Sequence, residues 1–261
     1  MPRLPWPLGP IAHRGLHDAA AGIIENTPSA VTAAIAKGYA VEVDVQAAKG
    51  GVPVVFHDRT LQRLIEGAGA VDTLTPAELG RLAYKVGADR IVTLDALLEI
   101  VGGRVPLVIE VKTGFTAPGA FEEAIARSVR AYRGPLALMS FDPFTMMALK
   151  AHAAAVPRGL LSYRWDDGWM PSLSAPLRRQ LRALTHLSAI GPSFIAYDID
   201  DLPAFRPLLQ KRLRGLSLLT WTVRTPAQRA KAARYADAII FEGFEPPATA
   251  TSDRGRDGAR A

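Results

Sequence analysis

The sequence predicts an α/β protein folded as a (β/α)8 TIM barrel with a short insertion after the second strand. Three observations predict it. Apolar runs rich in β-branched residues alternate with amphipathic segments, and the alternation recurs eight times. Several apolar runs are nearly continuous, as expected for strands buried on both faces. Eight such units in 261 residues match the size of one barrel, although a doubly wound open sheet would show the same alternation.

The expected strands are short, and the first three carry charged or imidazole side chains. They span Ile11–Arg14, Ala40–Gln46, Val105–Lys112, Leu136–Phe141, Arg158–Ser162, Phe194–Asp198, Leu216–Val223 and Ala238–Phe241. An extra strand, Val52–His57, follows a glycine turn and begins the insertion, which continues through a short capped helix at Thr75–Leu79. We expect the insertion to carry His57 to the same end of the barrel as His13.

Amphipathic segments separate these strands, and several begin with a proline behind a good capping residue. Thr27, Asp142 and Thr225 are such caps. The expected helices span Pro28–Lys37, Thr93–Val101, Phe121–Tyr132, Pro143–His152, Pro176–His186, Pro203–Leu213 and Pro226–Tyr235.

Three further segments complete the expected organisation. The irregular segment Tyr163–Ser174 follows the fifth strand, so we expect it to lie over the site as a loop. Residues 8–247 are expected to form one domain. The tail 248–261 lacks hydrophobic periodicity and is expected to be disordered.

Composition excludes several classes of protein. The 49% of hydrophobic and 21% of charged residues are typical of a globular protein. The chain has no cysteine, which excludes disulfides, thiolate metal sites and cysteine nucleophiles. No stretch is apolar enough to span a bilayer, and the N-terminal residues lack a signal core, so we expect a cytoplasmic protein without stable membrane association. Although the net charge is +6, the basic residues lack interleaved aromatics, so nucleic acid is not the expected partner.

Three carboxylates predict a metal site. Glu42 and Asp44 lie two residues apart on one expected strand, so both side chains point to the same face. Two inward carboxylates repel each other unless a cation lies between them. Glu110 on the next barrel strand would complete a set of oxygen ligands, which favours one divalent ion, Mg²⁺ or Ca²⁺. The alternative is that these are ordinary strand-end carboxylates paired with arginines.

Two histidines and two cations predict the chemistry beside that ion. His13 and His57 end apolar strands and have the intrinsic pKa needed to exchange protons near neutrality. Arg14 and Lys112 supply fixed positive charge for an anionic phosphate, or neutralise the carboxylates. The combination predicts a metal-dependent phosphoester enzyme.

Two aromatic residues at strand ends and one helix start also need interpretation. Trp221 ends the seventh strand and Phe141 the fourth, and either could line the pocket for an alcohol group of the substrate or only pack in the core. Glu25-Asn26-Thr27-Pro28 is mainly the start of a helix, with Thr27 as its cap.

An ordered set of motifs resembles the glycerophosphodiester phosphodiesterase family over the chain from Ile11 to Phe244. The motifs are His13-Arg14-Gly15, Glu25-Asn26-Thr27, Glu42-Val43-Asp44-Val45, Val55-Phe56-His57-Asp58 with Leu61 and Arg63, Ile109-Glu110-Val111-Lys112, Ser140-Phe141-Asp142 and Trp221-Thr222-Val223. The resemblance implies a barrel with an insertion after its second strand. It also implies His13 and His57 as the acid–base pair, Arg14 and Lys112 on the phosphate, and Glu42, Asp44 and Glu110 as metal ligands.

The implied reaction is the hydrolysis of a small glycerophosphodiester to sn-glycerol 3-phosphate and an alcohol. Three alternatives stay open. A lysophospholipase D would use the same site but should have an exposed apolar rim near Trp165, Trp169 and Met170. A cyclising phospholipase D would stop at a cyclic phosphate. A non-catalytic phosphodiester-binding protein would not need both histidines.

The sequence departs from the family pattern at two places. Ile24 stands where a proline usually precedes the Glu-Asn-Thr triplet. Relatives commonly end the eighth barrel strand in a Thr-Asp pair, whereas this chain has Ile240-Phe241-Glu242-Gly243. The second departure concerns the contribution of the last strand to the pocket.

Overall fold

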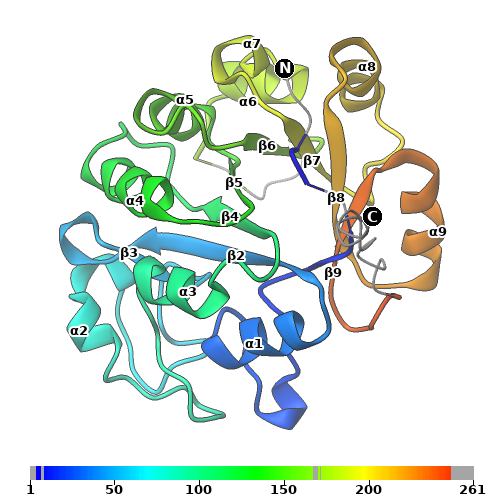
Figure 1. Ribbon diagram of the computed structural model, residues 1–261. Coiled ribbons are helices and arrows are strands. Elements are labelled where there is room, and N and C mark those ends of the chain that lie inside the picture. Colours follow the sequence, from blue (N-terminus) through cyan, green and yellow to red (C-terminus); the bar gives the residue numbers. More distant parts are fainter. Residues whose placement is uncertain (1–3, 7–8, 167–169, 171, 248–261) are drawn as a thin grey trace, which may run out of the picture.

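A closed ring of parallel strands surrounded by helices forms the centre of the protein (Figure 1). The computed structural model describes residues 4–6, 9–166, 170 and 172–247. The tail that we expected to be disordered, 248–261, therefore lies outside the described residues.

Eight parallel strands make up the barrel, in the order β1-β9-β8-β7-β6-β5-β4-β2, and β1 pairs with β2 to complete the ring. They are β1 Ile11–Ala12, β2 Ala40–Ala47, β4 Leu107–Val111, β5 Leu136–Ser140, β6 Arg158–Ser162, β7 Phe194–Asp198, β8 Ser217–Val223 and β9 Ala238–Phe241. Because the ring has no open edge between its first and last strands, the expected TIM barrel is confirmed and the doubly wound open sheet is excluded.

Helices cover the outside of this ring (Figure 1). They are α1 Pro28–Ala36, α2 Pro76–Leu79, α3 Leu94–Val101, α4 Ala120–Ala131, α5 Pro143–His152, α6 Ala175–Ala183, α7 Leu187–Ile190, α8 Phe205–Arg214 and α9 Pro226–Tyr235. Thr27, Asp142 and Thr225 accept backbone hydrogen bonds at the starts of α1, α5 and α9, as predicted. The expected helix Pro176–His186 is α6 but ends earlier, at Ala183, because Leu184 adopts a left-handed conformation with φ 56°, and the short helix α7 begins only at Leu187.

The side chains of the strands alternate between two cores. On β2, Val41 and Val43 face outward and pack with Val31 of α1 and Leu97 of α3. Residues facing the other way fill the inside of the barrel, among them Ala40, Val108, Met139, Phe194 and Leu219. Burial of each large apolar side chain contributes about 1.5–3 kcal/mol, so both layers hold the barrel closed. Polar residues on the inward face are therefore exceptional, and they mark the site.

The insertion after the second strand is confirmed. Strand β3, Pro53–Val55, runs antiparallel to β2 with Val55 opposite Val45. The chain from there to α3 packs on a small core of its own, which includes Phe56, Leu61 and Ile65. This strand is shorter than expected, and His57 follows it in a turn rather than ending it.

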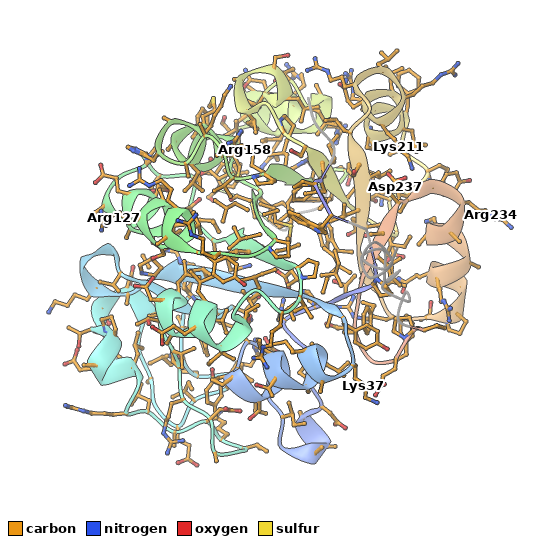
Figure 2. All side chains as sticks on the ribbon, viewed as in Figure 1. Lys37, Arg127, Arg158, Lys211, Arg234 and Asp237 are labelled. Carbon is orange, nitrogen blue, oxygen red and sulfur yellow. The ribbon has the colours of Figure 1, made fainter. Side chains whose placement is uncertain are left out.

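Basic side chains are spread around the outside of the barrel. Figure 2 shows Arg127, Lys211 and Arg234 on three different helices, α4, α8 and α9, and Lys37 just after the end of α1. Lys211 is paired with Asp237 at 2.8 Å. Across the described ranges, none of the helices combines the length and the apolar character needed to cross a membrane.

Candidate active site

A cavity of about 200 Å³ opens at the carboxyl ends of the barrel strands. Its lining includes seven of the eight residues predicted from the sequence: His13, Arg14, Glu42, His57, Glu110, Lys112 and Trp221. The eighth, Asp44, is 1% exposed and lies behind this lining, in contact with Arg14 and Lys112. The fold therefore brings the whole predicted set together.

The register of the sheet brings the three carboxylates into one cluster. Asp44 of β2 pairs with Glu110 of β4, and Glu42 lies two residues before Asp44 on the same inward face. One carboxylate oxygen from each residue lies within 4.8 Å of those of the other two. Such a cluster is the oxygen-rich arrangement that a hard divalent cation prefers.

The negative charge of Asp44 is compensated by neighbouring side chains. Lys112 Nζ lies 3.2 Å from its Oδ1, Arg14 Nε lies 3.2 Å from its Oδ2, and the Asn26 side chain donates to Oδ2 at 2.8 Å. Burial alone would raise the pKa of Asp44, but Lys112 and Arg14 outweigh it and hold the pKa well below its usual value. Asp44 is therefore a stable carboxylate.

Glu42 has the opposite environment. Its Oε2 accepts the backbone N–H of Arg14 at 3.0 Å, whereas its buried Oε1 has no hydrogen-bond partner among the described residues. Burial, reinforced by the charges of Asp44 and Glu110, raises the pKa of Glu42 well above its usual value. Glu110 accepts a hydrogen bond from Lys112 at 2.9 Å, yet burial raises its pKa as well. The cluster thus has more buried carboxylates than its cations satisfy, which fits a divalent metal ion as the missing partner.

His57 reaches the cavity because β3 turns back along β2. The backbone N–H of Phe56 donates to Asp44 O at 3.1 Å, and the Gln46 side chain donates to the carbonyls of Phe56 and Asp58. His57 Nδ1 lies 2.6 Å from Asp58 Oδ1, which leaves Nε2 as the nitrogen that can meet a substrate. Burial lowers the pKa of His57, so the ring is neutral near pH 7 and able to accept a proton.

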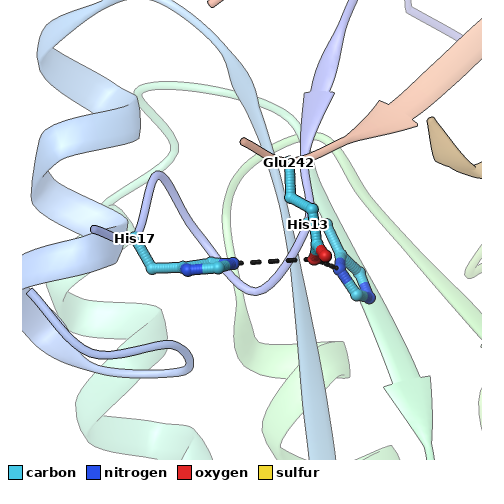
Figure 3. Close-up of side chains that lie close together, drawn as sticks. All are labelled: His13, His17 and Glu242. Carbon is cyan, nitrogen blue, oxygen red and sulfur yellow. Dashed lines mark hydrogen bonds and ion pairs between the residues drawn. The ribbon is translucent and has the colours of Figure 1, made fainter. Parts of the chain in front are cut away.

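His13 follows β1 in a sharp turn. The expected strand Ile11–Arg14 ends at Ala12, because Arg14 and Gly15 take left-handed conformations with φ 55° and 79°. His13 Nδ1 lies 2.5 Å from Glu242 Oε2 (Figure 3). Burial lowers the pKa of His13 even though the hydrogen bond with Glu242 opposes this effect.

Glu25 joins the two sides of the cavity. It accepts hydrogen bonds from Arg14 at 2.6 Å and from Arg63 at 2.9 and 2.7 Å. Burial would raise the pKa of Glu25, but the hydrogen bonds from Arg63 and the charge of Arg14 lower it. The expected helix start at Thr27 is confirmed, and the two residues before it additionally hold Arg14 and Asp44 in place.

Aromatic residues form one wall of the cavity. Trp221 is half-buried and packs edge-on against Phe141, with ring centroids 5.4 Å apart. Trp165, near which a lysophospholipase D was expected to have an exposed apolar rim, is 2% exposed, and its indole N–H donates to Ser162 Oγ at 2.9 Å. Trp165 therefore does not contribute to such a rim, because it packs on Tyr163 inside the barrel. Trp169 lies outside the described residues.

The sequence interpretation missed four charged residues of this site. Arg224, Asp198 and Asp200 line the cavity but were not predicted to belong to it, and Glu242, which contacts His13, was noted only as a departure from the family pattern. Their positions in the chain indicate the site, because all four lie at or just after the ends of the last three barrel strands, whose carboxyl ends face the cavity.

The closed barrel and the convergent charged groups at its strand ends define a TIM-barrel enzyme. The family model described as "Glycerophosphoryl diester phosphodiesterase family" matches residues 13–242. The chain belongs to this family. This confirms the resemblance, and with it the expected enzyme class, a phosphoric diester hydrolase.

Relatives agree with this assignment, and solved structures share the fold. The glycerophosphodiester phosphodiesterase of Caldanaerobacter subterraneus subsp. tengcongensis is 32% identical over 58% of this chain, and the match spans 65% of that protein's length. Glycerophosphodiester phosphodiesterase 1 of Mus musculus is 36% identical over 82% of this chain and 71% of its own. An Oleispira antarctica phosphodiesterase, solved with the product sn-glycerol-3-phosphate, has a TM-score of 0.71 at 24% identity, covering 90% of this chain and 93% of that one. A Thermotoga maritima glycerophosphodiester phosphodiesterase has a TM-score of 0.66 at 23% identity, covering 88% and 92%.

Proposed function

We propose that this protein hydrolyses glycerophosphodiesters to sn-glycerol 3-phosphate and an alcohol, using one divalent metal ion, Mg²⁺ or Ca²⁺. The observation that carries the proposal is that one cavity is lined by two histidines, two cations and two of three clustered carboxylates. A phosphodiester needs all three kinds of group: proton exchange, charge on the phosphate and a metal site. The family membership and the product named for the Oleispira relative support the same reaction.

Glu42, Asp44 and Glu110 hold the metal ion in this proposal. These three carboxylates outnumber the cations beside them, and Oε1 of Glu42 has no hydrogen-bond partner among the described residues, which supports their role as metal ligands. When bound, the ion supplies positive charge that stabilises the phosphate as negative charge develops on it and lowers the pKa of a bound hydroxyl. Arg14 and Lys112 keep Asp44 ionised and present positive charge to the phosphate from the cavity wall.

His13 and His57 exchange the protons. One of them accepts the proton of the glycerol 2-hydroxyl as its oxygen attacks phosphorus, and the other donates a proton to the departing alcohol. Water then opens the resulting cyclic phosphate with the two histidines in exchanged roles, which restores both protonation states. The Nδ1 of each ring is held by a carboxylate, so each presents Nε2 to the cavity. Groups placed in this way typically contribute about 10²–10⁴-fold to the rate.

The test is the release of sn-glycerol 3-phosphate from glycerophosphocholine by metal-stripped protein, with and without added Mg²⁺ or Ca²⁺. We expect no release without metal and restored turnover with one of the two ions. Phosphorus NMR of the products separates sn-glycerol 3-phosphate from a cyclic phosphate that is not opened. Absence of release with either ion, from protein that is folded by circular dichroism, would overturn the proposal in favour of a lipid substrate or a binding role.

A further inference from the structure

Closure of the barrel places Glu242 next to His13, although 229 residues separate them in the sequence. Strand β9 pairs with β1 in the register Ala12 to Phe241, and the backbone N–H of His13 donates to Phe241 O at 2.9 Å. The next residue on each strand is therefore His13 on one side and Glu242 on the other. Figure 3 shows the Glu242 carboxylate facing the His13 ring. Oε2 of this carboxylate lies 2.5 Å from His13 Nδ1.

Other contacts hold the Glu242 carboxylate in this position. Arg224 Nε donates to its Oε1 at 2.5 Å, and His17 Nε2 approaches its Oε2 to 3.7 Å from the side opposite His13 (Figure 3). The side chain is only 21% exposed. Burial would raise the pKa of Glu242, but the hydrogen bond with His13 and its other partners hold the pKa far below the usual value. The carboxylate is therefore ionised and acts as an acceptor throughout the neutral range.

The same arrangement occurs on the other side of the cavity. His57 Nδ1 lies 2.6 Å from Asp58 Oδ1, and Arg63 Nε donates to Asp58 Oδ2 at 2.5 Å. Each proposed acid–base histidine thus has a carboxylate on Nδ1 and an arginine on the second carboxylate oxygen. Asp58 is adjacent to its histidine in the chain, whereas Glu242 reaches its histidine only through the closed barrel. The repeated geometry argues for a common purpose rather than an incidental ion pair.

We propose that Glu242 is a positioning residue for the reaction: it fixes the His13 ring in the tautomer that carries its proton on Nδ1 and directs Nε2 to the reacting oxygen. The inference rests on the proposed function, because it assumes that His13 exchanges a proton with the substrate. An ionised carboxylate on Nδ1 favours the N–H on that nitrogen and stabilises the imidazolium that forms when Nε2 accepts a proton. Arg224 in turn fixes the carboxylate, so the ring has one orientation.

The substitution Glu242→Gln tests this directly. Both oxygens of the carboxylate now accept hydrogen bonds, from Arg224 and His13. An amide has one oxygen and one NH₂ group, so one of these donors must face an N–H. If the oxygen stays on Arg224, the NH₂ group faces Nδ1 and stabilises the wrong tautomer of His13. We expect kcat to fall at least about tenfold, and up to about 10⁴-fold, while KM and Ca²⁺ affinity change less than about twofold.

Two further variants separate positioning from a structural role. Glu242→Asp keeps the charge on a shorter side chain and should retain more activity than Glu242→Gln. Glu245→Gln removes the same charge from an exposed residue that pairs only with Lys37 at 3.0 Å in the described chain, and should leave kcat unchanged. Nitrogen-15 spectra of the five histidines, with the His13 signals assigned by His13→Asn, report the tautomer without turnover. We expect the proton on Nδ1 in the wild type and a shift toward Nε2 in Glu242→Gln.

Each outcome decides a different question. A Glu242→Gln variant with wild-type kcat and an unchanged tautomer overturns the positioning inference and leaves the proposed function standing. Losses of Ca²⁺ affinity and melting temperature that parallel the loss of kcat would also overturn it, since they indicate a structural role. If the wild type itself does not hydrolyse glycerophosphocholine with either metal, the proposed function is overturned. The nitrogen-15 spectra still test whether Glu242 fixes the tautomer of His13.

Discussion

Glu42 and Asp44 lie two residues apart on one strand and are equally buried at 1% exposure, yet their pKa values are shifted in opposite directions. Burial acts on both in the same sense, so the difference comes from their partners. Asp44 contacts Lys112, Arg14 and the Asn26 amide. Glu42 accepts one backbone N–H and faces two other carboxylates. The unsatisfied charge at one end of the cluster is where a metal ion has most to neutralise.

Metal stabilisation should therefore increase with pH. The pKa of Glu42 is raised in the folded protein, so between about pH 4.5 and that raised value the folded state binds more protons than the unfolded state. The free energy of unfolding of the metal-free protein then loses this contribution as pH rises. A bound metal ion interacts with the deprotonated carboxylates and offsets the destabilisation caused by the buried Glu42 charge. We expect the rise in melting temperature caused by Mg²⁺ or Ca²⁺ to be at least about 3 °C larger at pH 8 than at pH 5.

Other titrating groups do not account for this difference. The pKa of Asp44 is lowered, so its contribution to stability is lost only as pH falls below its unfolded value of 3.8. The buried histidines have lowered pKa values, so in the metal-free protein their contribution to stability rises with pH up to about 6.5, which is opposite in sign to the contribution of Glu42. Subtracting the melting temperature without metal from that with metal, at each pH, largely removes the histidine contribution. An equal metal-induced rise in melting temperature at pH 5 and pH 8 would contradict the argument.

Substitutions at the two carboxylates should have opposite effects on the metal-free protein. At pH 8, Glu42→Gln removes a poorly compensated charge and should raise stability by about 1 kcal/mol. Asp44→Asn leaves Lys112 and Arg14 without their shared partner and should lower stability by about 3 kcal/mol. Both variants should lose the metal-dependent rise in melting temperature. Urea unfolding in the presence of a chelator measures both effects, and changes of the same sign would contradict the assignment of partners.

Local signals in the sequence were sufficient to predict most of the fold. Continuous apolar runs such as Phe194–Asp198 and a capping threonine before a proline, as at Thr225, specify strands and helix starts within short windows. Among the boundaries that differ from the prediction, two differ because a single residue, Arg14 or Leu184, takes a left-handed backbone conformation that its side chain does not signal. Such conformations are imposed by tertiary contacts, and short windows do not contain them.

The site was predictable where each residue lies on its own strand end, as for Glu110 and Lys112. Partnerships between distant segments were not. The contact of Glu242 with His13 depends on the first and last strands pairing, and the bridge from Glu25 to Arg63 depends on the fold of the insertion. The burial of Trp165 was also missed, because a loop position alone does not reveal that a side chain turns into the barrel.

Replacing either histidine should abolish turnover without removing the metal. His13→Asn and His57→Asn keep a polar side chain but cannot exchange a proton near neutral pH, so kcat should fall by about 10²–10⁴-fold. Calorimetric titration with Ca²⁺ should give an affinity close to that of the wild type, since neither residue is among the three carboxylates. His152→Asn, at an exposed position on α5, is the control and should have wild-type kcat. Retained activity in both single variants would contradict the assignment of His13 and His57 as the acid–base pair.

Trp221 should contribute to substrate binding more than to the chemical step. Its half-buried ring lines the cavity beside Phe141. Trp221→Ala removes this wall and should raise KM for glycerophosphocholine about tenfold, which corresponds to about 1.4 kcal/mol of lost contact. Trp221→Phe keeps an apolar ring and should raise KM less. A large fall in kcat at unchanged KM would instead place Trp221 in the acid–base machinery.

The turn that carries His13 and Arg14 should tolerate no side chain at Gly15. Gly15 has φ +79°, and a Cβ there would lie 2.7 Å from the Ala30 carbonyl carbon of α1. Its N–H also donates to Glu42 O at 3.1 Å, so a displaced turn moves both strands of the site. Gly38 has a similar φ of +72° with nothing within 4 Å, so Gly38→Ala incurs only the left-handed strain, about 1–2 kcal/mol. Gly15→Ala adds the clash and should lower the free energy of unfolding by about 1–3 kcal/mol more. Urea unfolding of the two variants isolates this difference, and equal losses would mean that α1 shifts to make room.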